Sequence, residues 1–422
     1  MQGSDAVIHA LEKEGISYIS GFSGGGLAPL WRPIRESSTI KAFATRHERL
    51  GVEIADGYSR ATGKVGVAMT GTGPGATNTL TGIASCFADN VPVLLLMGQH
   101  PLRNLGKEYQ QEVSSSIFDT LVKWKGTFTR IDEIPNVMRR AFTALRSTSP
   151  GPVVLEMPQD VLTAEADDQV LHYNAVGASP KSSPDRQDVE KAADLLTNAK
   201  YPVLNVGGGT ISAEAWDEIK ELAEMLSMPV ATTLLGKSVF PEDHPLSLGL
   251  GVFPRSKYAT GPALQINRKA DVVLAVGNSY RLPNGTDGRP IPEGVKLIHV
   301  NSDAGDLNKT YQADLAILAD AKLALRDIIE AVKDRVPVSK RGVKNEVTQE
   351  ISQSRKKWLN EWMPIFTDPS SPTNGYRVVY DLMQVTDRDK TIAIHDAGGS
   401  RGYITQFWVS TKPRNFVAMG GM

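Results

Sequence analysis

The chain has 422 residues, a length that suggests about three domains of roughly 150 residues each. Its 46 Lys and Arg residues nearly balance its 47 Asp and Glu residues, which gives a net charge of -1. This balance gives no net positive charge that would favour binding to nucleic acid or to an anionic membrane. The longest apolar run, residues 91–97, is too short to span a bilayer, and no basic-then-apolar signal segment opens the chain. We therefore expect a cytoplasmic small-molecule enzyme with neither a nucleic-acid nor a membrane partner.

Helical and strand patterns alternate over residues 1–165. Helical patterns cover residues 6–14 and 48–61, and strand patterns cover residues 18–22, 65–69, 91–97 and 152–158. Such alternation predicts an α/β fold, in which helices cover both faces of a parallel sheet. The single cysteine, Cys86, falls within an apolar helical pattern, so we expect a packed thiol and no disulfide within the chain.

Two short stretches carry most of the chemical information in this first region. Glu48 lies in the first turn of the helix predicted for residues 48–61, and a Gly-Thr-Gly-Pro-Gly run, residues 71–75, follows the strand predicted for residues 65–69. Alone, Glu48 only complements the helix dipole. Gly73 and Gly75, however, lack a Cβ atom and let a flat ligand approach the backbone beside that acid. The pairing favours a ligand site over a purely structural role.

The same stretches resemble the thiamin-diphosphate (ThDP) enzymes of the acetolactate synthase and pyruvate oxidase superfamily. The matching motifs are Arg46-His47-Glu48, Ala55-Asp56-Gly57-Tyr58-Ser59-Arg60, Gly73-Pro74-Gly75-Ala76-Thr77-Asn78, Asp89-Asn90-Val91-Pro92 and Gly98-Gln99. The resemblance implies that residues 1–165 form the pyrimidine-binding domain and that Glu48 is catalytic, because the family glutamate hydrogen-bonds the aminopyrimidine of the cofactor. The further cofactor contacts that it implies in this domain are Gly25, Gly26, Gly73, Pro74, Gly75 and Asn78.

Proton transfer by Glu48 favours a carboxyl group buried among apolar side chains, because burial raises a carboxyl pKa towards working pH. Leu50, Ile54 and the strand at residues 65–69 are the expected walls.

Two further residues match positions near the substrate in the family. Gln111 lies in a polar loop, residues 106–112, which is otherwise a solvated surface segment. Lys123 aligns with a lysine near the same pocket, and a surface lysine explains it equally well.

Residues 166–187 are polar and rich in Ser, Pro and Asp, which is typical of a linker. Residues 188–336 then repeat the alternation, with strands expected at 202–206, 230–233, 271–277 and 296–301 and a helix at 213–226. The fold class is therefore tandem doubly wound parallel-sheet domains.

In this central domain, residues 207–209 form a Gly-Gly-Gly turn that could receive a phosphate, although tight-turn glycines are the commoner explanation. By resemblance the domain binds FAD, an adenine nucleotide or nothing. Its Ser279-Tyr280-Arg281-Leu282-Pro283-Asn284 run lacks the charged pattern of the flavin-binding members, which argues against FAD.

Residues 337–422 resemble a second linker and the beginning of the diphosphate-binding domain. A strand expected at residues 391–395 leads into a loop that contacts the diphosphate in the family, and the matching residues are Ala397, Gly398, Gly399 and Ser400. No metal ligand is assigned within the chain. The Mg²⁺ ligands are expected beyond Met422, in a C-terminal part that we expect to be missing, and the runs at 286–288 and 305–308 are treated as decoys because nothing makes them converge.

We expect a ThDP- and Mg²⁺-dependent transferase or lyase that cleaves or joins a carbon–carbon bond of a 2-oxo acid, similar to acetolactate synthase. Its implied partner is a second copy, in a homodimer or homotetramer with the site at the subunit interface. The alternatives with the same cofactor are a 2-hydroxyacyl-CoA lyase or oxalyl-CoA decarboxylase acting on an acyl-CoA, a sulfoacetaldehyde acetyltransferase and a simple decarboxylase. A catalytically silent nucleotide-binding or assembly subunit is the alternative from another class.

Overall fold

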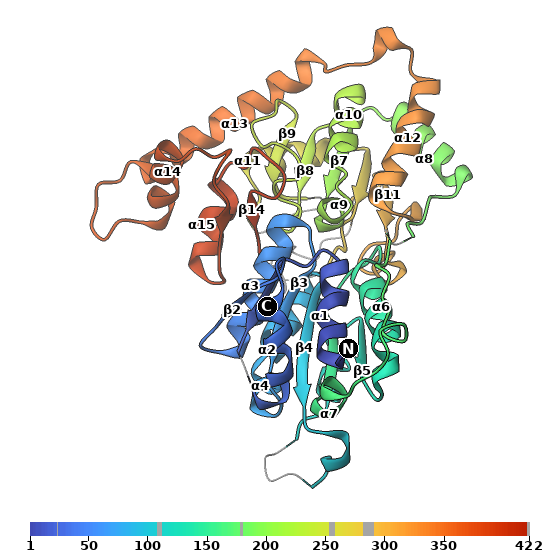
Figure 1. The fold of residues 1–422 in the computed structure, drawn as a ribbon. Coiled ribbons are helices and arrows are strands. Elements are labelled where there is room, and N and C mark those ends of the chain that lie inside the picture. Colours follow the sequence, from blue (N-terminus) through green and yellow to red (C-terminus); the bar gives the residue numbers. More distant parts are fainter. Residues whose placement is uncertain (23, 108–111, 178–179, 253–257, 282–290, 420–422) are drawn as a thin grey trace. The chain divides into compact units, whose positions relative to one another are not determined.

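Two parallel six-stranded sheets organise the chain (Figure 1). The computed structural model describes residues 1–422 except 23, 108–111, 178–179, 253–257, 282–290 and 420–422. The chain divides into unit 1, residues 1–180, and unit 2, residues 181–420.

The sheet of unit 1 has the strand order β2-β1-β3-β4-β6-β5, and all its pairings are parallel. Its strands are β1 (Tyr18–Gly21), β2 (Lys41–Ala44), β3 (Gly66–Thr70), β4 (Val93–Gln99), β5 (Trp124–Thr127) and β6 (Val153–Pro158). The α-helices are α1 (Gly3–Lys13), α2 (Trp31–Glu36), α3 (Glu48–Thr62), α4 (Pro74–Asn78), α5 (Leu80–Ala88), α6 (Ile134–Leu145) and α7 (Gln159–Thr163). Short 3₁₀ helices cover Gly25–Leu30, Leu102–Asn104, Ser115–Phe118 and Ile131–Glu133.

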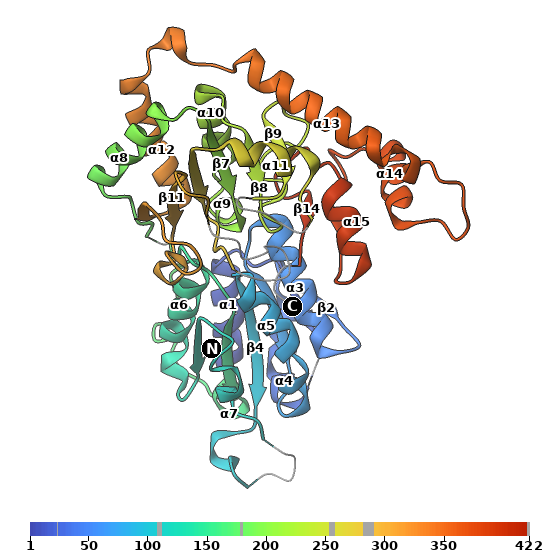
Figure 2. The same cartoon turned by 180° about the vertical axis from the view of Figure 1, so that it is seen from behind.

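Helices cover both faces of this sheet because its central strands are apolar on both sides. Leu94 and Leu96 of β4 pack in one core with α1 and α6, while Val93 and Leu95 pack in another with α3 and α5. Figure 1 shows α1 in front of β4, and Figure 2 shows α5 in front of it on the other face. The expected doubly wound parallel sheet is confirmed. Cys86 of α5 is buried, and burial raises the pKa of its thiol well above the usual value, as expected for a packed thiol.

Unit 2 contains a second parallel sheet with the order β12-β11-β10-β7-β8-β9. Its strands are β7 (Pro202–Val206), β8 (Val230–Thr232), β9 (Ser247–Leu250), β10 (Val272–Val276), β11 (Lys296–Asn301) and β12 (Leu315–Leu318). The helices of this part are α8 (Arg186–Asn198), α9 (Gly208–Ser212), α10 (Trp216–Leu226), α11 (Gly261–Ile266) and α12 (Ala321–Arg335), with 3₁₀ turns at Asn267–Lys269, Ala304–Asp306 and Val338–Lys340. The structure adds β9 and β12 to the expected strands. The helix expected at 213–226 begins only at Trp216, because Glu214 adopts a positive φ of 54° between α9 and α10.

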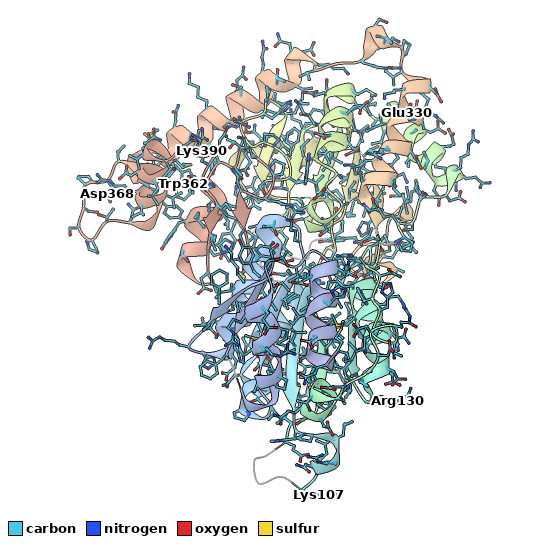
Figure 3. All side chains as sticks on the ribbon, in the orientation of Figure 1. Lys107, Arg130, Glu330, Trp362, Asp368 and Lys390 are labelled. Carbon is cyan, nitrogen blue, oxygen red and sulfur yellow. The ribbon has the colours of Figure 1, made fainter. Side chains whose placement is uncertain are left out.

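The last part of unit 2 packs around aromatic side chains. It comprises α13 (Asn345–Phe366), α14 (Gly375–Val385), β13 (Ala393–Ile394), α15 (Gly399–Phe407) and β14 (Phe416–Val417). Trp362 of α13, labelled in Figure 3, lies with its ring centroid 4.6 Å from Phe407 and 4.8 Å from Tyr376, which ties α15 and α14 to the long helix. The strand expected at 391–395 shortens to two residues, paired in parallel with β14.

Residues 166–187 connect the two sheets along the chain, and their composition predicts an exposed linker. Only part of this segment is exposed. Leu171 and Tyr173 are buried in the core of unit 1. The hydroxyl group of Tyr173 donates a hydrogen bond to Glu14, whose carboxylate also pairs with Arg146 at 2.5 Å. The exposed part of the segment is therefore shorter than 166–187.

Candidate functional site

Glu48 is the first residue of α3 and lies just beyond the carboxyl end of β2. His47 caps the helix, since its Nδ1 atom accepts a hydrogen bond of 3.2 Å from the backbone N–H of Arg49. The Glu48 side chain is half-buried, and its Oε2 atom accepts a 3.0 Å hydrogen bond from Nδ2 of Asn78. The structure therefore brings together two predicted site residues that are 30 positions apart.

Glycines shape the turn beside this carboxylate. Gly73 has φ 61° and ψ -120°, a conformation that is open to glycine and strained for other residues. A Cβ atom on Gly75 would lie 2.9 Å from Oγ1 of Thr70 and 3.7 Å from Oε1 of Glu48. Gly75 thus keeps the space beside Glu48 open, and Pro74 begins the short helix α4 directly after Gly73.

The glycines after β1 have different environments. A Cβ atom on Gly26 would meet the backbone nitrogen of Gln99 at 3.0 Å, so this glycine allows close backbone packing. Around Gly25 no atom of the described residues lies within 4 Å of such a Cβ position. Of these two predicted cofactor residues, only Gly25 faces open space.

The expected apolar walls around Glu48 are wrong for α3. Leu50 and Ile54 are 45% and 47% exposed, and the residues of α3 that are buried are Gly51, Val52, Ala55, Asp56 and Ser59. The face of α3 that packs on β1 needs small residues at the contact, because a Cβ atom on Gly51 would come within 2.7 Å of the Cα atom of Gly21. Only a side without bulky side chains can approach β1 so closely.

Exposed apolar side chains continue from this face of α3 onto the strands beside it. Tyr18 is 40% exposed and its ring lies 5.6 Å from the rings of both Phe43 and Tyr58. Phe43 itself is 49% exposed. We call the set Tyr18, Phe43, Leu50, Ile54 and Tyr58 the α3 apolar face.

Lys123 is not near Glu48 within unit 1. It directly precedes β5, and its backbone N–H donates to the carbonyl of Pro152 at the amino end of β6. Glu48 and the glycine turns follow the carboxyl ends of their strands, at the opposite edge of the parallel sheet. The Nζ atom of Lys123 lies 3.1 Å from the hydroxyl oxygen of Ser149. Gln111 lies outside the described residues, and the roles of both residues stay predictions.

The loop expected to contact a diphosphate leads into α15. Gly398 adopts φ 84° at the N-cap, and no described side chain caps the helix. Ala397, Gly398, Gly399 and Ser400 are all exposed, so the first backbone N–H groups of this nine-residue helix face solvent. Such N–H groups, together with the helix dipole, favour an anion.

Two residues near these sites escaped the sequence reasoning. Oγ1 of Thr70 is buried and has no hydrogen-bond partner among the described residues, although it lies against Gly75. Nε of Arg401, in the first turn of α15, is likewise buried without a partner in the described part of the chain. Neither carries a motif signal, but each directly adjoins a predicted glycine motif in sequence.

The glycine turn after β7 is a packing device. The backbone N–H groups of Gly207 and Gly209 donate to the carbonyls of Val276 and Gly277. A Cβ atom on Gly207 would come within 2.2 Å of the Gly277 carbonyl oxygen. These amides are therefore not available to a phosphate, and α9 spans only five residues. The tight-turn explanation is confirmed for Gly207 and Gly209.

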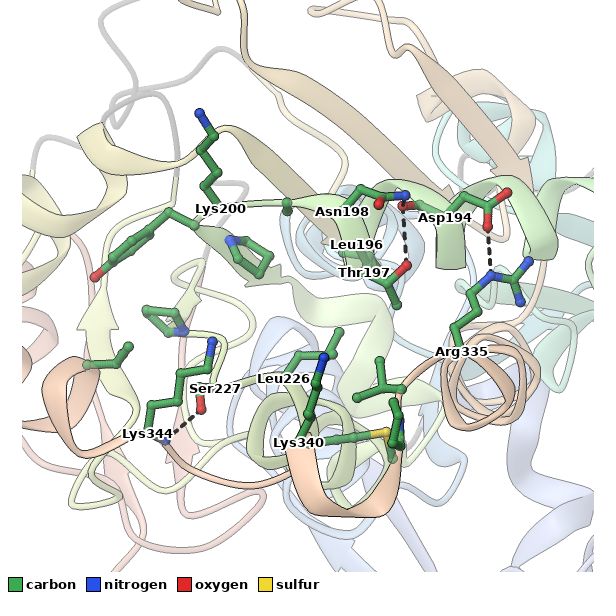
Figure 4. A pocket seen from close by; sticks show the side chains of 18 residues that line it. Asp194, Leu196, Thr197, Asn198, Lys200, Leu226, Ser227, Arg335, Lys340 and Lys344 are labelled. Carbon is green, nitrogen blue, oxygen red and sulfur yellow. Dashed lines mark hydrogen bonds and ion pairs between the residues drawn. The ribbon is translucent and has the colours of Figure 1, made fainter.

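A cavity of about 530 Å³ in unit 2 does not coincide with any predicted site residue (Figure 4). It lies at the amino ends of β7 and β8, and Lys340 and Lys344, just before α13, line it. Arg335 on its wall pairs with Asp194 at 2.7 Å. Ser227 closes another side by donating to the Gly342 carbonyl and accepting from the Lys344 N–H. The cavity lies between the segment before α13 and the amino ends of β7 and β8.

Among the described residues, no group of three or more His, Cys, Asp or Glu side chains could hold a metal ion. In the decoy run at 305–308, Asp306 instead pairs with Lys309 at 3.0 Å. The other decoy, at 286–288, lies outside the described residues. Within the described part of the chain no helix is long and apolar enough to cross a membrane.

Comparison with known proteins finds two family models that match parts of this chain. Residues 1–118 match the thiamine pyrophosphate enzyme N-terminal TPP-binding domain, and residues 189–328 match the central domain of the same enzymes. A probable acetolactate synthase large subunit of Methanocaldococcus jannaschii is 33% identical over 100% of this chain and 71% of the relative. A probable acetolactate synthase large subunit of Methanococcus aeolicus is 32% identical, again over 100% of this chain and 71% of the relative.

A solved structure shares the fold. The X-ray structure of a candidate thiamin diphosphate-dependent enzyme from Mycobacterium smegmatis superimposes with a TM-score of 0.80, at 22% identity, over 100% of this chain and 77% of that one. The two domain matches and the two relatives point to the same family of enzymes. The chain belongs to the thiamine pyrophosphate enzymes, a family of ThDP-dependent enzymes, and it is related there to the acetolactate synthase large subunits.

Proposed function

We propose that this protein is an acetolactate-synthase-like carboligase that acts on a 2-oxo acid with ThDP and Mg²⁺. The observation that carries the proposal is the state of the Glu48 carboxylate. Asn78 holds Oε2, while no described protein group donates to Oε1, which faces the space that Gly75 leaves open. A half-buried carboxylate with one free oxygen beside a glycine turn fits a heterocycle that offers a ring nitrogen.

The residues around Glu48 fit the pyrimidine half of ThDP. Thr70 contributes a buried hydroxyl group without a partner in the described structure, and Gly25 faces open space. In this assignment Glu48 holds the pyrimidine ring and exchanges a proton with it, Asn78 orients the carboxylate, and Gly73 and Gly75 admit the ring. When bound, ThDP supplies the carbon nucleophile and the electron sink for chemistry next to a carbonyl.

The start of α15 fits the diphosphate half. Its exposed N–H groups at Gly399 and Ser400 suit phosphate oxygens, and Arg401 adds a cation in the same turn. In this proposal, residues from 337 onward begin the diphosphate-binding domain. Mg²⁺ belongs to the same assignment, where it would offset the negative charge of the diphosphate, and no ligand for it is assigned to a described residue.

The α3 apolar face supports the proposed homodimer or homotetramer. Exposed apolar patches rimmed by polar residues are typical of protein interfaces. Leu50, a member of the α3 apolar face, is only two residues from Glu48 in the sequence. A second copy that covers it would also remove water from the neighbourhood of Glu48, as the chemistry of a proton-sharing carboxyl group favours.

A donor screen tests the proposal. The protein is incubated with ThDP, Mg²⁺ and either 2-oxo acids or acyl-CoA thioesters, and carbon dioxide and the ligated product are measured. Consumption of a 2-oxo acid with ligation supports the proposal, whereas turnover of an acyl-CoA alone identifies the lyase or oxalyl-CoA decarboxylase alternative. If neither donor reacts and calorimetry detects no ThDP binding, the chain is the silent subunit instead.

FAD is not part of this proposal. The purified protein is expected to be colourless, because the Gly207 and Gly209 amides are already hydrogen-bonded within the fold. A flavin absorption spectrum with one flavin per chain would contradict this expectation.

A further inference from the structure

Glu156 of unit 1 carries a buried carboxylate, and its hydrogen-bond partners have no role in the proposed reaction. Glu156 of β6 is 6% exposed, and the described residues place no cation in an ion pair with it. Its Oε1 accepts a 2.8 Å hydrogen bond from Nε2 of Gln99, and its Oε2 accepts from the hydroxyls of Ser115 at 2.7 Å and Thr127 at 3.0 Å. The Ser115 backbone N–H adds a longer contact of 3.4 Å. A buried carboxylate is tolerated only when such donors replace its water.

The contacts around Gln99 give its amide group a single orientation. Its Nε2 donates to Glu156 and to the carbonyl of Val113, both of which can only accept. Its Oε1 accepts 2.9 Å hydrogen bonds from the backbone N–H of His100 and from the hydroxyl of Thr72. Rotating the amide by 180° would set its NH₂ group against the His100 N–H and its oxygen against the Glu156 carboxylate. The Thr72 contact is therefore made to a fixed, 2% exposed acceptor.

Thr72 connects this buried network to the proposed pyrimidine site. It opens the glycine turn after β3, and its carbonyl accepts the backbone N–H of Gly75 at 3.2 Å. The turn continues through α4 to Asn78, whose side chain holds Glu48. The turn thus has one side-chain anchor at each end, Thr72 on Gln99 and Asn78 on Glu48.

We infer that Glu156 and Gln99 are positioning residues that hold the glycine turn, through Thr72, in the conformation that receives the cofactor pyrimidine. The inference rests on the proposed function for the identity of the ligand, while the anchoring of the turn stands on contacts within the protein. The strand order explains this arrangement, because β3, β4 and β6 are neighbours in the sheet and carry the turn, Gln99 and Glu156.

Two isosteric substitutions separate positioning from general stability. Thr72→Val removes the link between the turn and Gln99, and Thr127→Val removes an equivalent hydroxyl donor from Glu156 on the side away from the turn. Each loses one hydrogen bond, so both variants are expected to show similar, small decreases in Tm. Only Thr72→Val is expected to accelerate amide hydrogen exchange at residues 73–78 in the protein without cofactor.

Cofactor titration supplies the second measurement. Thr72→Val is expected to raise the ThDP concentration for half-saturation by about 3- to 10-fold, the equivalent of one hydrogen bond, while Thr127→Val leaves it unchanged. Equal exchange rates at 73–78 in both variants, or equal ThDP affinities, would overturn the inference. If wild-type protein binds no ThDP but Thr72→Val still loosens the turn, the proposed function fails and the anchoring survives.

Discussion

Asn78 donates a 3.0 Å hydrogen bond from Nδ2 to Oε2 of Glu48, so the glycine turn after β3 and the first turn of α3 are held by one contact. The bond leaves Oε1 of Glu48 directed at the space beside Gly75.

Replacing Glu48 by Gln is expected to reduce turnover by about 10²- to 10⁴-fold, because an amide keeps the shape of the carboxyl group but cannot exchange a proton. The measurement is exchange of the C2 proton of bound ThDP. Glu53→Gln, on the same helix and paired with Arg49, is the control. Exchange at the wild-type rate in Glu48→Gln would remove Glu48 from the mechanism.

Two glycines of α3 are expected to respond in opposite directions to replacement by Ala. At Gly57 a Cβ atom meets no described atom within 4 Å, so Gly57→Ala is expected to raise the free energy of unfolding by about 0.5–1 kcal/mol through helix propensity. At Gly51 a Cβ would press on Gly21, so Gly51→Ala is expected to cost about 1–3 kcal/mol. Urea unfolding of both variants measures the difference, and stabilisation by Gly51→Ala would contradict the packing of α3 on β1.

The Lys237–Glu242 ion pair connects the C-terminal part of unit 2 to the part that contains the six-stranded sheet. Nζ of Lys237 is 2.5 Å from Glu242 Oε1, Glu242 Oε2 accepts from the Ser410 N–H at 2.7 Å, and burial lowers the pKa of Lys237. Lys237→Met leaves a buried carboxylate and is expected to cost about 3–5 kcal/mol. Lys390→Met, at an 84% exposed side chain (Figure 3), is expected to stay within about 0.5 kcal/mol.

A double variant separates the pair from its surroundings. Lys237→Met combined with Glu242→Leu removes both buried charges and is expected to recover most of the lost stability, as replaced buried ion pairs generally do. Thermal unfolding of the single and double variants provides the comparison. A double variant as unstable as the sum of its single changes would show that the two charges act independently.

Asp271 is expected to contribute to acid unfolding of unit 2. Burial acts to raise its pKa, but hydrogen bonds from the backbone N–H groups of Lys200 at 2.7 Å and Tyr201 at 2.8 Å outweigh burial and hold the pKa below its usual range. A carboxyl pKa that is depressed in the folded state stabilises the protein above the unfolded value, about 3.9, and this contribution is lost as the pH falls through the folded pKa.

Asp271→Asn should therefore lower stability at neutral pH and flatten the loss of stability below about pH 4. The free energy of unfolding is measured as a function of pH, with Asp327→Asn on the exposed surface of α12 as the control for net charge. An acid dependence that is unchanged in Asp271→Asn would contradict the assignment.

Local sequence patterns were sufficient for the elements that carry the site. The α/β alternation, the position of Glu48 in the first turn of α3 and the glycine turn after β3 depend on periodicity, helix capping and the missing Cβ of glycine, which act within a few residues. The relation between Glu48 and the turn was inferred from their pairing in the sequence and from the resemblance, and the hydrogen bond through Asn78 came from the structure.

Tertiary packing decided what local patterns leave open. Leu50 and Ile54 follow a helical apolar period, yet α3 buries its small residues because only they allow backbone contact with β1. Lys123 and Glu48 lie at opposite ends of the parallel strands, because Lys123 precedes the amino end of β5 whereas Glu48 follows the carboxyl end of β2. Thr72, Gln99 and Glu156 are spread over 85 positions of the sequence, and only the order of β3, β4 and β6 in the sheet makes them neighbours.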